Sequence, residues 1–182
     1  GVENRLFVFG LLLSSCWLGT PTLACPGSKA TVHARCEMSV VFDQSCDVVK
    51  EEILARISSD TWIDPHNQGV YDLKSGDSDD GDDSSLTGQR LSGNKKYTDL
   101  FDFSFWNLPS SSSGCTVQAC SESQVTSVLD FDTNYCNLHN LYCNSESDNC
   151  IVIKNELTYN EQFQNCWQHN AKSCGTSELK ST

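Results

Sequence analysis

Positively charged residues are scarce in this chain. Twelve Lys and Arg stand against 24 Asp and Glu, which gives the 182 residues a formal net charge of −12 at pH 7. Proteins that bind nucleic acid or anionic membrane surfaces need an excess of Lys and Arg to contact phosphate groups. The composition therefore argues against nucleic acid and anionic membranes as partners.

The short motifs of common catalytic sites are also missing. The sequence has no G-x-S-x-G, no H-E-x-x-H and no phosphate-cradling glycine loop. Asp64 with His66 is the best remaining acid/base pair, but two neighbours in a turn that contains Pro65 seldom point at one reacting atom. We therefore assign no catalytic residue, and we expect no cofactor.

Long apolar runs are absent except near the N-terminus. There, Arg5 precedes the apolar run Leu6 to Leu13, and Thr22 and Ala24 supply small residues at the two positions that signal peptidase requires. This run is shorter than the roughly 20 residues that span a bilayer, and the pattern is typical of a secretory signal peptide. Because the chain begins with Gly1, we expect part of the charged region to be missing. Residues 1–24 are predicted to be removed, with no membrane insertion after cleavage.

Cysteine, by contrast, is abundant. Of the eleven cysteines, Cys16 lies in the predicted signal peptide, so an even ten remain. An even number in a secreted chain predicts five disulfides, each contributing about 2–4 kcal/mol, and leaves no thiol to act as a nucleophile. A zinc site would need paired C-x₂₋₄-C ligands, which Cys115-x₄-Cys120 does not supply, so no metal site is predicted. The ten cysteines are Cys25, Cys36, Cys46, Cys115, Cys120, Cys136, Cys143, Cys150, Cys166 and Cys174.

Five aspartates are concentrated in one run, SGDSDDGDDSS, at residues 75–85. If Gly81 is placed at the glycine position of a calcium-binding loop, Thr87 falls where a bidentate Glu is required. The motif therefore fails. A solvated acidic loop is predicted, with weak divalent cation binding as the alternative.

Residue periodicity predicts several strands and one clear helix. Apolar and polar residues alternate from Val32 to Phe42, with His33 on the polar, solvent-exposed face. Apolar residues recur at helical spacing from Cys46 to Ile57. Further strands are predicted at Val70–Leu73, Leu86–Ser92, Tyr97–Trp106 and Cys150–Phe163.

The stretch from Gly114 to Cys143 is predicted to be the central helical element. Ser121 and Gln124 match a capping box, which places a helix start near Cys120. Apolar residues then continue at helical spacing, in one helix or in two short helices broken near Asp130 to Thr133. Cys136 and Cys143 would lie about 10 Å apart along a helix axis, beyond the roughly 7 Å limit for a disulfide. We therefore expect each to pair elsewhere.

The order of elements predicts a single disulfide-stabilised α+β domain spanning residues 25–174. Its order is β-α-β-β-β-α-β, with a mainly antiparallel sheet and two helices on one face. Residues 109–114 form a Ser-rich linker, and residues 175–182 are expected to be a disordered tail. A ferredoxin-like split β-α-β and a cystatin-like or helix-grip sheet both fit this order.

One loop combines an aromatic, a carboxylate, an imidazole and an amide. Trp62, Asp64, His66 and Asn67 surround Pro65 in a turn between the first helix and the next strand. Such residues serve turn geometry in many loops, and they also form binding sites. We take these four residues as the candidate binding residues and expect His66 to be on the surface.

Three segments together resemble small secreted cysteine-rich proteins of marine microalgae such as diatoms. They are Trp62 to Asn67, Ala119 to Val125, and Thr133 to Leu138 with Leu141 to Cys143. The resemblance covers about Trp62 to Cys143. It implies secretion and a shared scaffold, and it carries no activity and no catalytic residues.

The sequence thus favours a secreted, extracellular binding module over an enzyme. A rigid disulfide-stabilised scaffold with variable loops is sufficient for binding an extracellular protein or a small molecule. A small secreted hydrolase is the alternative, and an inhibitor of secreted proteases is the third possibility.

Overall fold

The computed structural model describes residues 25–75, 84–108, 114–147 and 150–175. The predicted signal peptide, most of the acidic run, most of the serine linker and residues 176–182 lie outside this part. The elements in chain order are β1 (Arg35–Phe42), α1 (Cys46–Ile57), β2 (Val70–Ser75), β3 (Ser85–Leu91), β4 (Thr98–Asn107), β5 (Cys115–Ser123), α2 (Thr133–His139), β6 (Tyr159–Cys166) and α3 (Ala171–Cys174).

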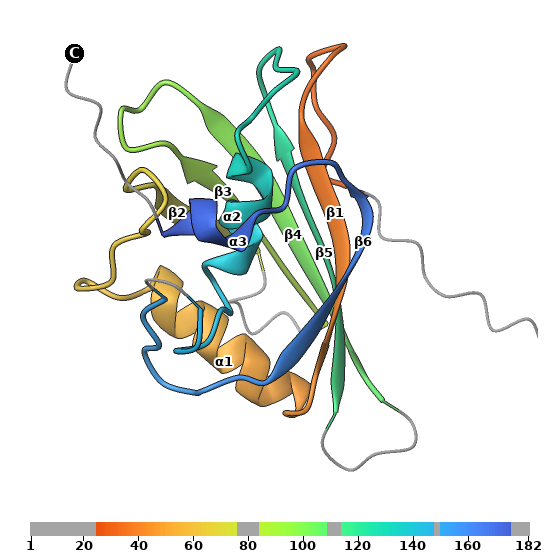
Figure 1. The fold of residues 1–182 in the computed structure, drawn as a ribbon, viewed down its shortest axis with the longest axis vertical. Coiled ribbons are helices and arrows are strands. Elements are labelled where there is room, and N and C mark those ends of the chain that lie inside the picture. Colours follow the sequence, from red (N-terminus) through yellow and green to blue (C-terminus); the bar gives the residue numbers. More distant parts are fainter. Residues whose placement is uncertain (1–24, 76–83, 109–113, 148–149, 176–182) are drawn as a thin grey trace, which may run out of the picture.

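The strands form one six-stranded antiparallel sheet in the order β2-β3-β4-β5-β1-β6. Strands β2 to β5 form a meander, and β1 lies between β5 and β6. The two edge strands are β2 and β6. All three helices lie on the same side of the sheet (Figure 1). The α+β class with a mainly antiparallel sheet and helices on one face is confirmed.

The connection from β1 through α1 to β2 distinguishes between the two topologies that fit the sequence. Strands β1 and β2 run in the same direction, and β3, β4 and β5 lie between them. A ferredoxin-like split β-α-β has a single strand in that place. The sheet instead curls round the helices as a long meander (Figure 1), which is closer to the cystatin-like or helix-grip arrangement.

The inner face of the sheet forms most of the hydrophobic core. Phe103 of β4 lies opposite Ala119 of β5, which lies opposite Met38 of β1, and all three are fully buried. Alternate residues of one strand point to the same face, so Phe101 and Phe105 extend the same apolar layer. Burying such side chains contributes about 1.5–3 kcal/mol each.

The prediction of a helix starting near Cys120 was wrong. Residues Cys115–Ser123 form β5, which pairs with both β1 and β4 at the centre of the sheet. The Ser121 hydroxyl donates to Asn134 Oδ1 at 2.8 Å, and the Gln124 amide donates to Gly27 O at 2.8 Å, so the two residues do not cap a helix. The order therefore gains a strand here and a short helix at the C-terminal end.

The helical part of that stretch is the short α2, which begins after the predicted break at residues 130–133. Asp132, just before it, has a left-handed backbone with φ 65°. The helix ends at His139, so Cys143 lies beyond it. Cys136 and Cys143 do not bond to each other, which confirms that part of the prediction.

The last strand is shorter than predicted. β6 begins at Tyr159, whereas Cys150 to Leu157 is irregular. In this irregular segment, backbone N–H groups donate to a side chain and not to a neighbouring strand. Those of Ile153, Lys154 and Asn155 donate to the buried carboxylate of Glu52 at 2.9, 2.7 and 2.6 Å. A carboxylate on α1 thus replaces the partner strand that the prediction required.

All ten predicted cysteines form disulfides. The pairs are Cys25–Cys120, Cys36–Cys166, Cys46–Cys115, Cys136–Cys174 and Cys143–Cys150. Two of them join neighbouring parts of the sheet to each other or to α1, one holds α3 against α2, and one closes a short loop. The remaining bridge, Cys25–Cys120, ties the N-terminal segment to the outer face of β5.

The N-terminal segment 25–34, called the strap below, explains why the prediction for His33 was wrong. His33 precedes β1, and its Nε2 lies 2.5 Å from Glu122 Oε1. Gly27 N donates to the other oxygen of Glu122 at 2.7 Å. Glu122 is on the outer face of β5, so the strap buries a surface that would otherwise face solvent.

Candidate functional site

The loop around Pro65 is largely buried. Trp62 packs against Tyr71 with ring centroids 5.9 Å apart. Asp64 is fully buried and accepts from Arg90 Nε at 2.7 Å and Nη2 at 2.5 Å. Its other oxygen accepts from His66 N at 3.0 Å and from Asn140 Nδ2 at 2.8 Å. Both oxygens of Asp64 are thus occupied by groups that hold the fold together.

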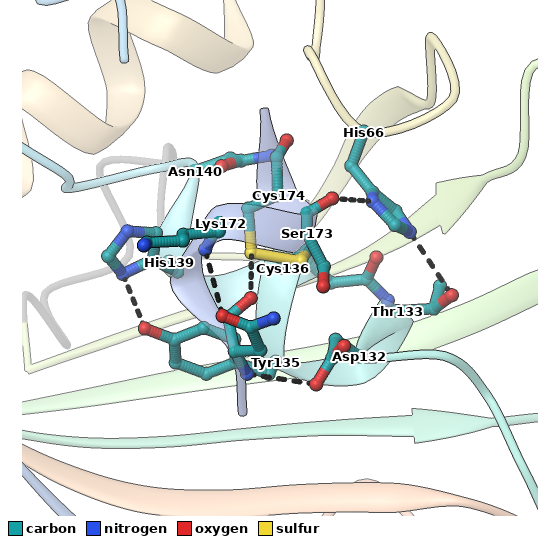
Figure 2. The surroundings of a disulfide bond; sticks show 12 residues. His66, Asp132, Thr133, Tyr135, Cys136, His139, Asn140, Lys172, Ser173 and Cys174 are labelled. Atoms are coloured by element: carbon teal, nitrogen blue, oxygen red, sulfur yellow. Dashed lines mark hydrogen bonds between the residues drawn. A yellow bond between two sulfur atoms is a disulfide. The ribbon is translucent and has the colours of Figure 1, made fainter. Parts of the chain in front are cut away.

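His66 connects the loop to two helices. Figure 2 shows its ring between α2 and α3, with Nδ1 3.1 Å from Ser173 O and Nε2 3.2 Å from Thr133 Oγ1. The side chain is 9% exposed. The expectation of a surface histidine is therefore corrected, because α3, held to α2 by Cys136–Cys174, covers the ring. Burial lowers the pKa of His66, and the nearby charge of Arg90 lowers it further.

Arg90 is the residue of this region that sequence patterns did not identify. It is 0% exposed and lies on β3, where its Nη2 donates to His66 O and, at 3.0 Å, to Asn67 Oδ1. Its guanidinium carbon lies 5.7 Å from the centre of the Tyr71 ring. The alternation of β3, with Leu86 and Gly88 inward, indicates that Arg90 is inward as well.

A cavity of about 660 Å³ opens beside this loop. Its walls come from Asn67 and Gln68, from the turn of residues 92–97 between β3 and β4, from the segment of residues 123–131 that follows β5, and from Thr133 at the start of α2. Ligand pockets in proteins have volumes of about 300–1,000 Å³. Of the four candidate binding residues, Asn67 lines this cavity, and Trp62, Asp64 and His66 do not.

Two carboxylates line the cavity. Asp99, 3% exposed, lies inward on β4 beside the phenylalanine layer, and its Oδ2 accepts from Asn137 Nδ2 at 2.8 Å. Asp130 Oδ2 accepts from Asn134 N at 2.9 Å and Nδ2 at 2.7 Å. The α2 amides thus hold one oxygen of each carboxylate. The position of Asp99 could have been inferred from its alternation with Phe101, Phe103 and Phe105.

The mouth of the cavity is apolar. Tyr97, Leu129 and Phe131 line it and are 53%, 64% and 72% exposed. Val125, which is partly covered, adds to this apolar rim. Apolar side chains gathered at the entrance of a polar-walled cavity are typical of a site that receives a ligand from solvent.

Backbone strain is concentrated in the loops that form the cavity. The described residues other than glycine with positive φ are Asn67, Gln68, Lys95, Phe131 and Asp132. All five belong to these loops or immediately adjoin them. Gly93 contributes to the same arrangement, because an added Cβ would overlap the carbonyl oxygen of Asn67. Strained backbone of this kind costs about 1–3 kcal/mol per residue and is often found at ligand sites.

A second polar cluster lies between α2 and β6. Glu161 accepts from Tyr142 OH at 2.7 Å and Tyr135 OH at 2.9 Å, and His139 Nδ1 lies 2.9 Å away. Burial raises the pKa of Glu161, but the hydrogen bonds and charge of His139, with both tyrosines, outweigh it, so the pKa is lowered. Burial, and then the charge of Glu161, raise the pKa of Tyr135 and of Tyr142. This cluster anchors β6 to the helices.

In the part of the chain that the structure describes, no three His, Cys, Asp or Glu side chains are grouped so that they could hold a metal ion. None of the helices seen in this part is both long and apolar enough to cross a bilayer. The acidic run proposed for weak cation binding lies mostly outside the described residues.

Comparison with known proteins gives no family for this chain. No protein-family model, no curated protein and no solved structure matches it.

Proposed function

We propose that this protein is a secreted, disulfide-stabilised binding module that takes a small ligand in the cavity formed by Asn67, the turn of residues 92–97 and the segment of residues 123–131. The observation that carries the proposal is a cavity of about 660 Å³ whose loops contain the strained backbone of the described chain. A sheet braced by five disulfides can hold such loops in place.

The first test fills the cavity. Thr126 and Val128 are both exposed on the segment after β5, and Thr126 lines the cavity. A Thr126→Trp variant should abolish binding of cavity ligands, because the indole takes up ligand space. The probe is a fragment library of neutral, cationic and anionic small molecules, monitored by amide chemical shifts. We expect shifts in the cavity loops of the wild-type protein.

Val128→Trp is the matched control, since Val128 is 73% exposed and does not line the cavity. It should bind the same fragments as the wild-type protein. If no fragment shifts the cavity loops, or if both tryptophan variants behave alike, the cavity is not the binding site.

A hydrolase remains the second candidate because two carboxylates, Asp99 and Asp130, line one cavity. Carboxylate pairs supply the acid and the base of many hydrolases. The binding interpretation is favoured because each carboxylate already accepts hydrogen bonds from α2 amides. Turnover of ester, glycoside, phosphate or peptide substrates by the purified protein would select the hydrolase.

Secretion is tested separately from binding. The five disulfides suit an oxidising compartment, and the N-terminal pattern predicts cleavage after Ala24. The protein recovered from the medium of expressing cells should therefore begin at Cys25, as determined by N-terminal sequencing. A chain that remains inside the cell, or that keeps the apolar run of residues 6–13, would contradict secretion by this route.

A further inference from the structure

The hydrogen-bonding groups left over in the cavity indicate the class of ligand. Asn67 and Asn94 line the cavity, and the side-chain oxygen of each accepts hydrogen bonds from other groups of the protein. Asn67 Oδ1 accepts from Arg90 Nη2 at 3.0 Å, and Asn94 Oδ1 accepts from Ser92 Oγ at 2.8 Å and from Lys96 N at 3.0 Å. An amide has one acceptor oxygen and one donor NH₂ group. The NH₂ groups of Asn67 and Asn94 are therefore available as donors to a ligand.

The hydroxyl oxygens of two serines that line the cavity also accept hydrogen bonds from within the protein. Ser123 Oγ accepts from Asn134 Nδ2 at 3.0 Å, and Ser127 Oγ accepts from Ala34 N at 2.9 Å. A hydroxyl that accepts a hydrogen bond still has its own hydrogen to donate. The cavity wall thus presents amide and hydroxyl donors from three different segments of the chain.

Acceptors are provided by the two carboxylates. Asp99 and Asp130 each use Oδ2 for hydrogen bonds within the protein, which leaves Oδ1 for a ligand. No Lys, Arg or His is among the described residues that line the cavity. An anionic ligand would therefore meet two negative charges and no positive one, in a protein of net charge −12.

We propose that the cavity binds a neutral, polyhydroxylated ring, that is, a carbohydrate, and this inference rests on the proposed binding function. Each sugar hydroxyl both donates and accepts, so it can pair with the amide and serine donors and with the aspartate acceptors. A cationic amine only donates, so it would pair with the two carboxylates and offer no acceptor to the amide and serine donors. Tyr97 and Phe131 line the cavity and are largely exposed, and aromatic rings suit the apolar C–H face of a sugar ring.

The decisive variant is Asn94→Asp. It keeps an oxygen to accept from Ser92 and Lys96, and it exchanges the donor NH₂ group for an acceptor that carries charge. Affinity for a neutral sugar should fall about tenfold, as expected for loss of one hydrogen bond to the ligand. Affinity for a cation should rise instead. The two ligand classes thus give opposite results for one substitution.

The probes are methyl glycosides of glucose, mannose and galactose, neutral oligosaccharides of the same sugars, glucose 6-sulfate and methylammonium, each titrated by calorimetry. Stronger binding of oligosaccharides than of single glycosides would identify a polysaccharide as the source, and equal binding would identify a free sugar. Asn160→Asp, at an exposed position of β6 outside the cavity lining, controls for the added charge and should bind like the wild-type protein.

The outcomes separate the two proposals. If library fragments bind in the cavity and no sugar does, the carbohydrate inference is overturned and the binding function stands. Binding of methylammonium that strengthens in Asn94→Asp overturns the inference in favour of a cation. Sugar binding that is unaffected by both Asn94→Asp and Thr126→Trp would place the sugar outside the cavity. If neither fragments nor sugars bind there, both proposals fail.

Discussion

His66 shows how much of this molecule depends on buried polar side chains. Its backbone oxygen accepts from Arg90, its N–H donates to Asp64, and its ring lies between Ser173 and Thr133. Removing a buried hydrogen-bonded side chain costs about 1–3 kcal/mol. Asp64 and His66 are buried and hydrogen-bonded within the protein, whereas Asn67 of the same loop lines the cavity.

Stability should therefore depend on the protonation of His66. Burial and the charge of Arg90 lower its folded-state pKa, so below about pH 6.5 the unfolded chain binds the proton more readily. The wild-type protein should lose stability between pH 7.5 and 5.5, by up to about 1.4 kcal/mol per pH unit from this residue. His66→Gln should be less stable at pH 7.5 and should lose less on acidification, as measured by thermal unfolding at both pH values.

The lowered pKa of Glu161 does not affect the comparison of the wild-type protein with His66→Gln between pH 7.5 and 5.5. A carboxylate with a depressed pKa contributes stability that is lost only as the pH falls below its ordinary range of about 4. His169→Gln, at an exposed position, provides the control and should keep the wild-type pH dependence. An unchanged pH dependence in His66→Gln would show that this ring does not control stability in the tested range.

At the scale of elements, residue periodicity correctly predicted a strand or a helix where one face is mainly apolar. The alternation in β1 and β4 and the helical spacing in α1 correctly predicted these elements, because each packs a mainly apolar face into the core, although Asp99 of β4 and Glu52 of α1 are buried as well. Their ends differ by a few residues, as for β1, which begins at Arg35 and not at Val32. The strands β2 and β3 were also placed correctly, although the inner face of β3 carries Arg90.

β5 was missed because its inner face is partly polar. Val117 and Ala119 are followed inward by Ser121 and Ser123, whose hydroxyls bond to Asn134. A strand whose buried side ends in serines shows little apolar alternation, and its Ala, Ser and Glu content resembles a helix start. The Asn134 side chain that bonds to these serines belongs to α2, 13 residues after Ser121 and 11 after Ser123, so the strand pattern itself does not reveal it. The polar residues that line the cavity next to β5 were not predicted for the same reason.

At the scale of the whole molecule, the disulfides join parts of the chain that are distant in sequence. Cys36–Cys166 spans 130 residues and Cys25–Cys120 spans 95, whereas Cys143–Cys150 spans 7. The even cysteine count correctly predicted that all ten would be paired. The pairing itself could not be derived, because it depends on which strands become neighbours in the folded sheet.

The strap allows this long-range bracing to be tested. Replacing Cys25 and Cys120 by Ser should destabilise the protein by about 2–4 kcal/mol, because closing a long loop restricts the unfolded chain strongly. It should also release residues 25–34 from β5, which exposes Glu122 and removes its contact with His33. The measurements are the midpoint of urea unfolding and hydrogen exchange of the strap amides.

The matched control is the double Ser variant of Cys143 and Cys150, whose loop is the shortest of the five. It should lose less stability than the strap variant, since the entropy of loop closure grows with the logarithm of loop length, and its strap amides should remain protected. Equal destabilisation of the two variants would show that strain or local packing, and not loop length, determines what each bridge contributes. Full protection of the strap without the Cys25–Cys120 bridge would show that the hydrogen bonds of Glu122 are sufficient to hold it.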